Sequence, residues 1–295
     1  MAATWDISRV TRQTMNKAIY IGELTLNITL KPDSTASTKV GDWAVNAAVL
    51  DGRMEVPTLF VGEVAADAVG DHIVAHLEDS KVDIKSIDRY TEGLSPVRIA
   101  GSDPEAKIVG HEKFPAEPVN AIWPRIDEGD VVVFGSYMAL DERNHNRLLD
   151  LLKYAKARKA IVIYLPYFAP YQVPRITRVM PQVFDSLELA DMVIATIDGI
   201  KAIFPGDDIA ATFKEHILFY CPKFLCMDAG KKEMRFFNGE ESWSKKCHPS
   251  DNTDFQWYAG ALAGAVRAIV LNHPDADGIM EGANETAHSE LAASI

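Results

Sequence analysis

Residues that could bind a phosphate group gather at the start of an apolar segment near the C-terminus. Asn252, Thr253 and Asp254 directly precede residues 255–266, a run rich in alanine and glycine that predicts a buried helix. The start of a helix leaves backbone N–H groups without partners and carries partial positive charge, a combination that favours phosphate. Asp251 and Asp254 add carboxylates at the same point, where an aspartate commonly caps a helix. The segment is therefore interpreted either as a phosphate site or as an aspartate-capped helix.

The elements that must position this segment alternate between apolar strands and helices. Short apolar runs predict buried strands at residues 58–61, 131–135, 160–165, 192–195 and 224–227. Helical patterns occur between them, at residues 43–50, 67–77 and 141–157. Apolar strands that alternate with helices are typical of a mostly parallel sheet covered on both faces. We therefore expect one large α/β domain.

The N-terminal part of the chain has a less regular pattern. Residues 1–16 predict a surface extension, residues 17–30 a strand and residues 31–39 a loop. Between residues 84 and 114 short alternating stretches are separated by glycine and proline, which favours antiparallel strands and turns. This region predicts a small β-rich insertion in the larger domain.

Composition excludes several classes of partner. The 295 residues include 30 basic and 42 acidic side chains, a net charge of −12, which argues against nucleic acid or an anionic membrane as partner. No apolar run reaches the ~18 residues of a membrane span, and the first residues lack a secretory pattern, so we expect a cytoplasmic protein. Cys221, Cys226 and Cys247 lack the spacing of a metal site, and none is predicted.

Several short segments follow one another in the order found in a known kinase family. They are Gly22–Asn27, Gly41–Ala48, Val61–Asp71, Val82–Asp83, Ala190–Val193, Asp228–Gly230 and the helix around Ala259–Leu262. In this order they resemble the PfkB family of carbohydrate and nucleoside kinases, over about residues 17–270. The resemblance implies the three-layer α/β ribokinase-like fold, in which helices cover both faces of a mostly parallel central sheet. It also implies a small β-sheet lid, formed from parts of about residues 24–40 and 84–116 within a domain of residues 17–295.

The resemblance also implies an activity and a set of substrate-binding residues. Such kinases transfer a phosphoryl group from ATP, with Mg²⁺, to a hydroxyl of a sugar or nucleoside, and pairing through the lid allows a homodimer. The matching substrate positions are Asn27, Gly41, Asp42 and Asn46. Asn27 stands in place of the family's aspartate. Asp42 replaces the second glycine of a Gly-Gly pattern, so its side chain is expected to narrow the pocket.

The phosphate-binding positions depart further from the family pattern. Asp228 and Gly230 match the family's Thr-x-Gly, and Asn252 and Thr253 lie over the glycines of its Gly-Ala-Gly-Asp motif. The resemblance assigns these four residues to the nucleotide. At about 4 Å and an effective dielectric near 20, the charge of Asp228 would oppose a phosphate by about 4 kcal/mol. The family's Asp-x-Asn-x-Arg and Asn-x-x-Glu segments are replaced at residues 165–169 and 196–199.

The catalytic base depends on the alignment of one segment. Counting back from Gly260 without a gap places Phe255 at the position of the family's aspartate base, whereas one inserted residue places Asp254 there. Two functions therefore remain open. The chain is either a PfkB-type kinase that uses ATP, Mg²⁺ and Asp254, or an inactive protein of the same fold that binds a small ligand or a protein partner.

Overall fold

A nine-stranded sheet forms the centre of the molecule. The computed structural model describes residues 15–101, 119–168, 172–173, 175–247 and 251–295. The strand order is β12-β11-β10-β9-β8-β7-β1-β4-β5, parallel except for the hairpin pairs β10–β11 and β11–β12. In chain order the strands are β1 Ala18–Ile21, β4 Thr58–Ala65, β5 Val82–Tyr90, β7 Val131–Gly135, β8 Ile161–Leu165, β9 Met192–Thr196, β10 Lys223–Asp228, β11 Glu233–Asn238 and β12 Glu241–Lys246.

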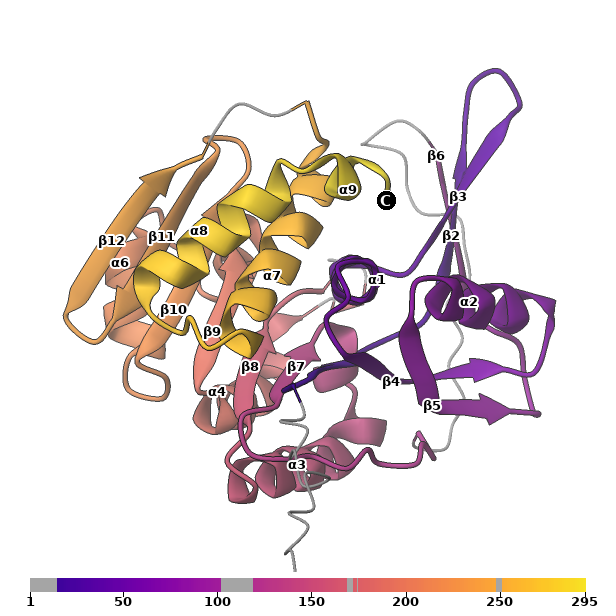
Figure 1. The fold of residues 1–295 in the computed structure, drawn as a ribbon, viewed down its shortest axis with the longest axis horizontal. Helices are drawn as coiled ribbons and strands as arrows, with labels where there is room; N and C mark the ends of the chain where they lie inside the picture. Colours follow the sequence, from indigo (N-terminus) through magenta and orange to yellow (C-terminus); the bar gives the residue numbers. More distant parts are fainter. Residues whose placement is uncertain (1–14, 102–118, 169–171, 174, 248–250) are drawn as a thin grey trace, which may run out of the picture.

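Helices cover both faces of this sheet, which separates two hydrophobic cores (Figure 1). One face is covered by α1 Trp43–Arg53, α2 Ala68–Asp79, α7 Asp254–Val270 and α8 Ala276–Ala287. The other is covered by α3 Glu142–Ala157, α4 Met180–Leu189, α5 Ile197–Ile203 and α6 Ile209–Thr212. The chain ends in the short α9 Glu290–Ala293. The predicted three-layer arrangement is confirmed.

A second, three-stranded sheet stands away from the main sheet (Figure 1). It has the order β3-β2-β6, with β2 Leu26–Leu30, β3 Ala36–Val40 and β6 Val97–Gly101. We call this sheet the lid. The rest of the predicted lid segment, from residue 102 to 116, and residues 1–14 of the predicted extension lie outside the described residues.

Three predictions for the N-terminal half are wrong. The single strand expected at residues 17–30 is two strands, because the chain leaves the main sheet after β1 to form the lid. The loop expected at residues 31–39 contains most of β3, whose exposed polar residues hide its strand character. The strands β5 and β6, expected to be antiparallel, pair in parallel with β4 and β2. Both are edge strands with partly exposed faces, so their alternation reflects their position at an edge.

Helix α7 is rich in small residues because α8 packs directly on its backbone. A side chain at Gly264 would come within 2.0 Å of the Gly282 carbonyl oxygen, and one at Gly282 within 2.6 Å of the Gly264 carbonyl oxygen. The two helices therefore meet backbone to backbone. This contact fixes the direction of α7 and hence the place where the helix begins.

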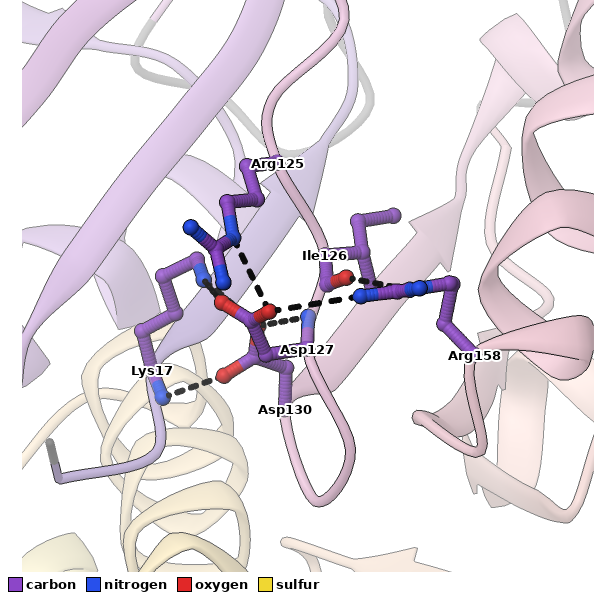
Figure 2. Close-up of polar contacts among 6 residues, drawn as sticks. All are labelled: Lys17, Arg125, Ile126, Asp127, Asp130 and Arg158. Carbon is purple, nitrogen blue, oxygen red and sulfur yellow. Dashed lines mark hydrogen bonds and ion pairs between the residues drawn. The ribbon is translucent and has the colours of Figure 1, made fainter. Parts of the chain in front are cut away.

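The amino-terminal end of the central strands is held by an ion network (Figure 2). Asp130 is buried and accepts hydrogen bonds from the Lys17 backbone N–H at 3.0 Å, the Lys17 ammonium at 2.6 Å and the Asp127 N–H at 2.8 Å. Asp127 also pairs with Arg125 and Arg158. Because these contacts join the start of β1, the start of β7 and the end of α3, the network ties this end of the sheet together.

A buried carboxyl group lies between β1 and α1. Asp51 has no exposed surface, and its Oδ2 accepts a 2.6 Å hydrogen bond from the Tyr20 hydroxyl. Its Oδ1 has no hydrogen-bond partner among the described residues. Burial raises the pKa of Asp51 well above its ordinary value, although the Tyr20 bond and the charge of Arg267 act in the opposite direction.

This carboxyl group makes the free energy of unfolding depend on pH in a predictable direction. Because its folded pKa is raised, its contribution is complete below the unfolded pKa of about 4 and is lost as pH rises through the folded pKa. We expect Asp51→Asn to raise the free energy of unfolding relative to the native chain, with a gain that grows from pH 4 to pH 8. Urea denaturation of both proteins across this range measures it. A gain that shrinks with rising pH would contradict the assignment.

Candidate functional site

The strand order reverses between β1 and β7, which places a crevice at the carboxyl ends of these two strands. From β1 the chain proceeds outward through β4 and β5, whereas from β7 it proceeds the other way through β8, β9 and β10. In open α/β sheets, ligands bind at such a reversal point. The residues that follow the two strands, Gly22–Glu23 and Ser136–Tyr137, are therefore the first candidates for the site.

Two small pockets occupy this crevice and share Glu23 and Tyr137. We call them together the cleft. The first is lined by Glu23, Thr25, Asp42, Arg98, Ser136, Tyr137, Tyr167 and Gln172. The second is lined by Gly22, Glu23, Glu63, Tyr137, Met138, Asp141, Arg143 and Asn144. Each has a volume of about 10 Å³, room for one water molecule. A sugar would enter only with a movement of the lid or of the lining side chains.

Strained backbone holds a polar pair at the centre of the cleft. Ser136 has φ 54° and ψ −162°, a conformation that is almost confined to glycine. It follows Gly135, where a side chain would come within 1.9 Å of the Leu165 carbonyl oxygen. The Ser136 hydroxyl donates a short hydrogen bond to the Glu23 carboxylate, and both residues are buried. Strain of this kind concentrates at functional sites.

The second pocket contains a buried ion cluster. The Arg143 guanidinium pairs with Glu63 and lies 3.1 Å from Asp141. Burial raises the pKa of Glu63, although the contact with Arg143 acts in the opposite direction. Together with the first pocket, this cluster makes the cleft rich in carboxylate, guanidinium, hydroxyl and amide groups. Such a lining suits a ligand with many hydroxyl groups better than an apolar one.

The four residues predicted to bind substrate lie together where the lid joins α1. The side-chain amides of Asn27 and Asn46 donate to backbone carbonyls, Asn27 to Gly41 at 2.7 Å and Asn46 to Val40 and Asp42. Gly41 has φ +69°, and a side chain there would meet Val45 at 2.3 Å, so the turn itself requires glycine. Among the four, Asp42 lines the cleft. Burial raises the pKa of Asp42, which also caps α1.

Two of the four predicted nucleotide residues, Asp228 and Gly230, lie at the turn after β10, and the other two, Asn252 and Thr253, directly precede α7. Asp228 ends β10, and its Oδ1 accepts a 3.0 Å hydrogen bond from the Lys231 N–H, with Gly230 exposed between them. The adjoining pocket, of about 60 Å³, is lined by Ile197, Asp207, Ile209, Cys226, Asp228, Lys231, Glu233 and Arg235. Its three carboxylates oppose the charge of a polyphosphate, and its two cations already pair with Asp228 and Glu233.

The start of α7 is capped by the chain itself. The Thr253 hydroxyl accepts a 3.3 Å hydrogen bond from the Gln256 N–H, and the Gln256 side chain accepts one from the Thr253 N–H at 2.9 Å. The expected cap by Asp251 or Asp254 is therefore wrong, because Thr253 precedes the first helical residue. The Asn252 amide donates to the Ala287 carbonyl at 2.9 Å.

Asp254 and Phe255, the two candidates for the base position, have different surroundings. Asp254 is the first residue of α7, its side chain is 71% exposed, and it lies 3.7 Å from the Lys232 ammonium. Phe255 is half-buried beneath Lys39 of β3, whose ammonium lies 4.4 Å from the ring centre. Both residues lie in the first turn of α7, which is a continuous helix from Asp254 to Val270.

A chain of aromatic rings lies between the cleft and the Asp228 turn. The Trp43 ring centre is 4.1 Å from that of Tyr167, which lines the cleft, and 4.9 Å from that of Tyr258 in α7. The Tyr258 hydroxyl oxygen accepts a 3.1 Å hydrogen bond from the Ala229 N–H. Burial raises the pKa of Tyr258 to about 12, so its phenol is neutral at pH 7. The rings fill the space between the two pockets.

Apart from Asp42, the residues that line the cleft were not identified from the sequence as site residues. For Ser136 a signal existed, since it directly follows a segment predicted to be a strand, and strand ends form the site in such sheets. Glu23 lies inside the single strand predicted over residues 17–30, which concealed its place at a strand end. Arg98, Tyr137, Tyr167 and Gln172 gave none, because lid and loop residues reach the cleft only through the tertiary fold.

Neither a metal centre nor a membrane span is evident in the part of the chain that the structure describes. Within those ranges no three His, Cys, Asp or Glu side chains are grouped so as to hold a metal ion. None of the described helices is long and apolar enough to cross a membrane.

Solved structures with closely similar folds are sugar and nucleoside kinases. No family model and no curated protein sequence matches the chain. Aminoimidazole riboside kinase from Salmonella enterica, solved with aminoimidazole riboside and an ATP analogue, is 14% identical with a TM-score of 0.80, covering 95% of this chain and 93% of its own. An uncharacterized sugar kinase from Pyrococcus horikoshii is 16% identical, TM-score 0.79, covering 92% and 91%. Fructokinase from Vibrio cholerae is 14% identical, TM-score 0.78, covering 93% and 91%.

These similarities extend over nearly the whole of this chain and of each kinase, and they include the main sheet with its helices. The fold predicted from the sequence is confirmed: the chain has the ribokinase-like fold of the PfkB-type carbohydrate kinases.

Proposed function

We propose that this chain binds a sugar or nucleoside in the cleft and that phosphoryl transfer from ATP is weak or absent. The observation that carries the proposal is the contrast between the two sides of the site. The cleft keeps a polar lining around the strained Ser136–Glu23 pair, whereas the phosphate side is closed by residues of the chain itself. The proposal is of a carbohydrate-binding protein with the fold of a kinase.

The cleft supplies chemistry that suits a hydroxylated ring. Carboxylate and amide oxygens of Glu23, Asp42 and Gln172 can accept hydrogen bonds from hydroxyl groups, and the Arg98 guanidinium can donate them. Tyr167 adds an aromatic face to the same pocket. A ligand that makes these contacts would replace the buried hydrogen bonds that the cleft now forms internally.

The residues on the phosphate side do not fit ATP and Mg²⁺. A phosphate needs free N–H groups, but the Ala229 N–H already donates to Tyr258 and the Gln256 N–H to Thr253. Asp228 adds a negative charge at this turn. The aromatic rings of Trp43, Tyr167 and Tyr258 also stand between the cleft and this turn.

The lid is our proposed surface for a homodimer. β3 is an edge strand, and four of its five residues are exposed. A second copy that packs against the lid would cover this surface.

We expect millimolar ATP with Mg²⁺ to leave the melting temperature nearly unchanged in differential scanning fluorimetry. A ligand at ~100 times its Kd would add about 2.7 kcal/mol, a shift of about 5 °C or more for a chain of this size. ADP with Mg²⁺ and Mg²⁺ alone serve as controls. A shift of that size with MgATP would overturn the proposal and restore the kinase.

The exposed carboxylate of Asp254 is the observation that favours the active kinase as a second candidate. If the chain phosphorylates a sugar, Asp254→Asn is expected to lower kcat by a factor of about 100 or more, because a general base contributes at least that much. Phosphate transfer from labelled ATP to a panel of sugars measures it. Full activity in the variant would exclude Asp254 as the base.

We expect Glu23→Gln to weaken binding of the sugar or nucleoside about tenfold, because a hydrogen bond to a charged group contributes about 1.5 kcal/mol. Titration calorimetry with the best ligand from a panel of sugars and nucleosides measures the change. Glu128→Gln is the matched control, since Glu128 is exposed at the opposite end of the sheet. Equal affinity in the Glu23 variant would place the ligand outside the cleft.

A further inference from the structure

A larger pocket lies at the opposite end of the strands from the cleft. It has a volume of about 410 Å³ and is lined by Lys223, Phe236, Asn238, Trp243, Pro274, Asp275 and Ala276. This volume is within the range of small-molecule sites, about 300–1,000 Å³. Lys223 begins β10, Asn238 ends β11 and Ala276 begins α8. We call it the β10–β12 pocket.

The pocket forms because α8 covers only part of the sheet beneath it. Lys223 pairs with Asn238, and Phe236 with Trp243, so these side chains share the face that packs against α7 and α8. Farther along β12 this face is covered, where Lys245 pairs with Glu281 of α8. Because α8 begins only at Ala276, it does not cover the end of the β11–β12 hairpin near Asn238. In Figure 1, α8 lies beside β10, β11 and β12, the strands at one side of the sheet.

The floor of the pocket is aromatic. Phe236 is 1% exposed, and the half-buried Trp243 ring has its centre 6.0 Å from that of Phe236. Pro274 and Ala276 form an apolar wall. A flat ring can therefore lie against Trp243 and displace water from apolar surface.

The rim of the pocket carries a lysine whose ammonium has no polar partner among the described residues. The ammonium of the half-buried Lys223 forms no hydrogen bond or ion pair with any of the described residues. The carboxylate of Asp275, across the pocket, accepts a 2.8 Å hydrogen bond from the Gly278 N–H and caps α8. That bond lowers the pKa of Asp275. The start of α8 therefore already stabilises the charge of Asp275, whereas the ammonium of Lys223 remains available to pair with an anion.

We propose that the β10–β12 pocket is a second binding site, for a small planar aromatic compound that carries one acidic group. The ring lies against Trp243, and the acidic group pairs with Lys223 while Asn238 offers its amide. The site is separate from the cleft, because it lies at the beginning of β10 and the cleft at the carboxyl ends of β1 and β7. It does not depend on the function proposed for the cleft.

Two probes that share one ring test the chemistry. Indole-3-acetate carries the acid, and tryptamine carries an ammonium on the same indole. Ligand-observed NMR titrations give the two affinities for the full chain. We expect saturable binding of indole-3-acetate at millimolar or lower Kd and weaker binding of tryptamine.

Two substitutions separate the charge from the ring. Lys223→Met is expected to weaken indole-3-acetate about threefold to fivefold, the size of a partly exposed ion pair, without weakening tryptamine. Trp243→Ala is expected to weaken both probes. Lys85→Met and Trp123→Ala are the matched controls, since Lys85 is exposed in β5 and Trp123 packs with Arg147 elsewhere.

Equal affinity for both probes, an unchanged affinity in Lys223→Met, or no saturable binding of indole-3-acetate would each overturn the proposal. If Trp243→Ala lowers the melting temperature, Lys223→Met still decides, because the Lys223 ammonium forms no hydrogen bond or ion pair with the described residues. A sugar found to bind the cleft leaves these outcomes unchanged.

Discussion

The pairing of β1 with both β4 and β7 is the constraint on which the rest of the structure depends. Since β1 is parallel to each neighbour, the carboxyl ends of all three strands point the same way. After β1 the chain continues to β4 and β5 on one side, and after β7 it continues to β8, β9 and β10 on the other. Glu23 and Ser136 lie in the cleft because they are among the residues that follow β1 and β7. Their hydrogen bond gives each of these buried side chains a polar partner.

The two ends of the central strands have different roles. At the amino ends, Asp130 uses its carboxylate for three hydrogen bonds that join separate segments of the chain. At the carboxyl ends, polar side chains from the lid, the strand ends and α3 converge on small pockets. One end is therefore built for stability, and the other carries the groups that can contact a ligand.

The turn after β10 and the start of α7 are both held by contacts within the chain. The Tyr258 hydroxyl accepts a hydrogen bond from the Ala229 N–H, and the Thr253 hydroxyl accepts one from the Gln256 N–H. The Phe255 ring lies beneath the Lys39 ammonium. These contacts keep the helix start and the turn ordered without a ligand, and they are the basis on which binding is proposed in place of phosphoryl transfer.

Much of the fold could be predicted from the sequence, because buried parallel strands are continuous apolar runs. The strands near residues 131–135 and 192–195 and the helix near 141–157 were found in this way. The predictions for β3, β5 and β6 were wrong, because the exposed faces of these strands weaken the apolar pattern. The site was harder to predict. Asn27 and Asn46 have the right chemistry for a sugar, but only the structure shows that their amides bond to the backbone.

The layers of the fold and the buried strands of the main sheet could be predicted from local sequence patterns alone. Only the tertiary structure decided which side chains meet. Glu23 and Ser136 are 113 positions apart, and the neighbouring rings of Trp43, Tyr167 and Tyr258 come from three separate segments of the chain. Local patterns depend on neighbours in the chain, whereas these contacts depend on strand order and register. That is the physical reason why the sequence predicted the fold better than the site.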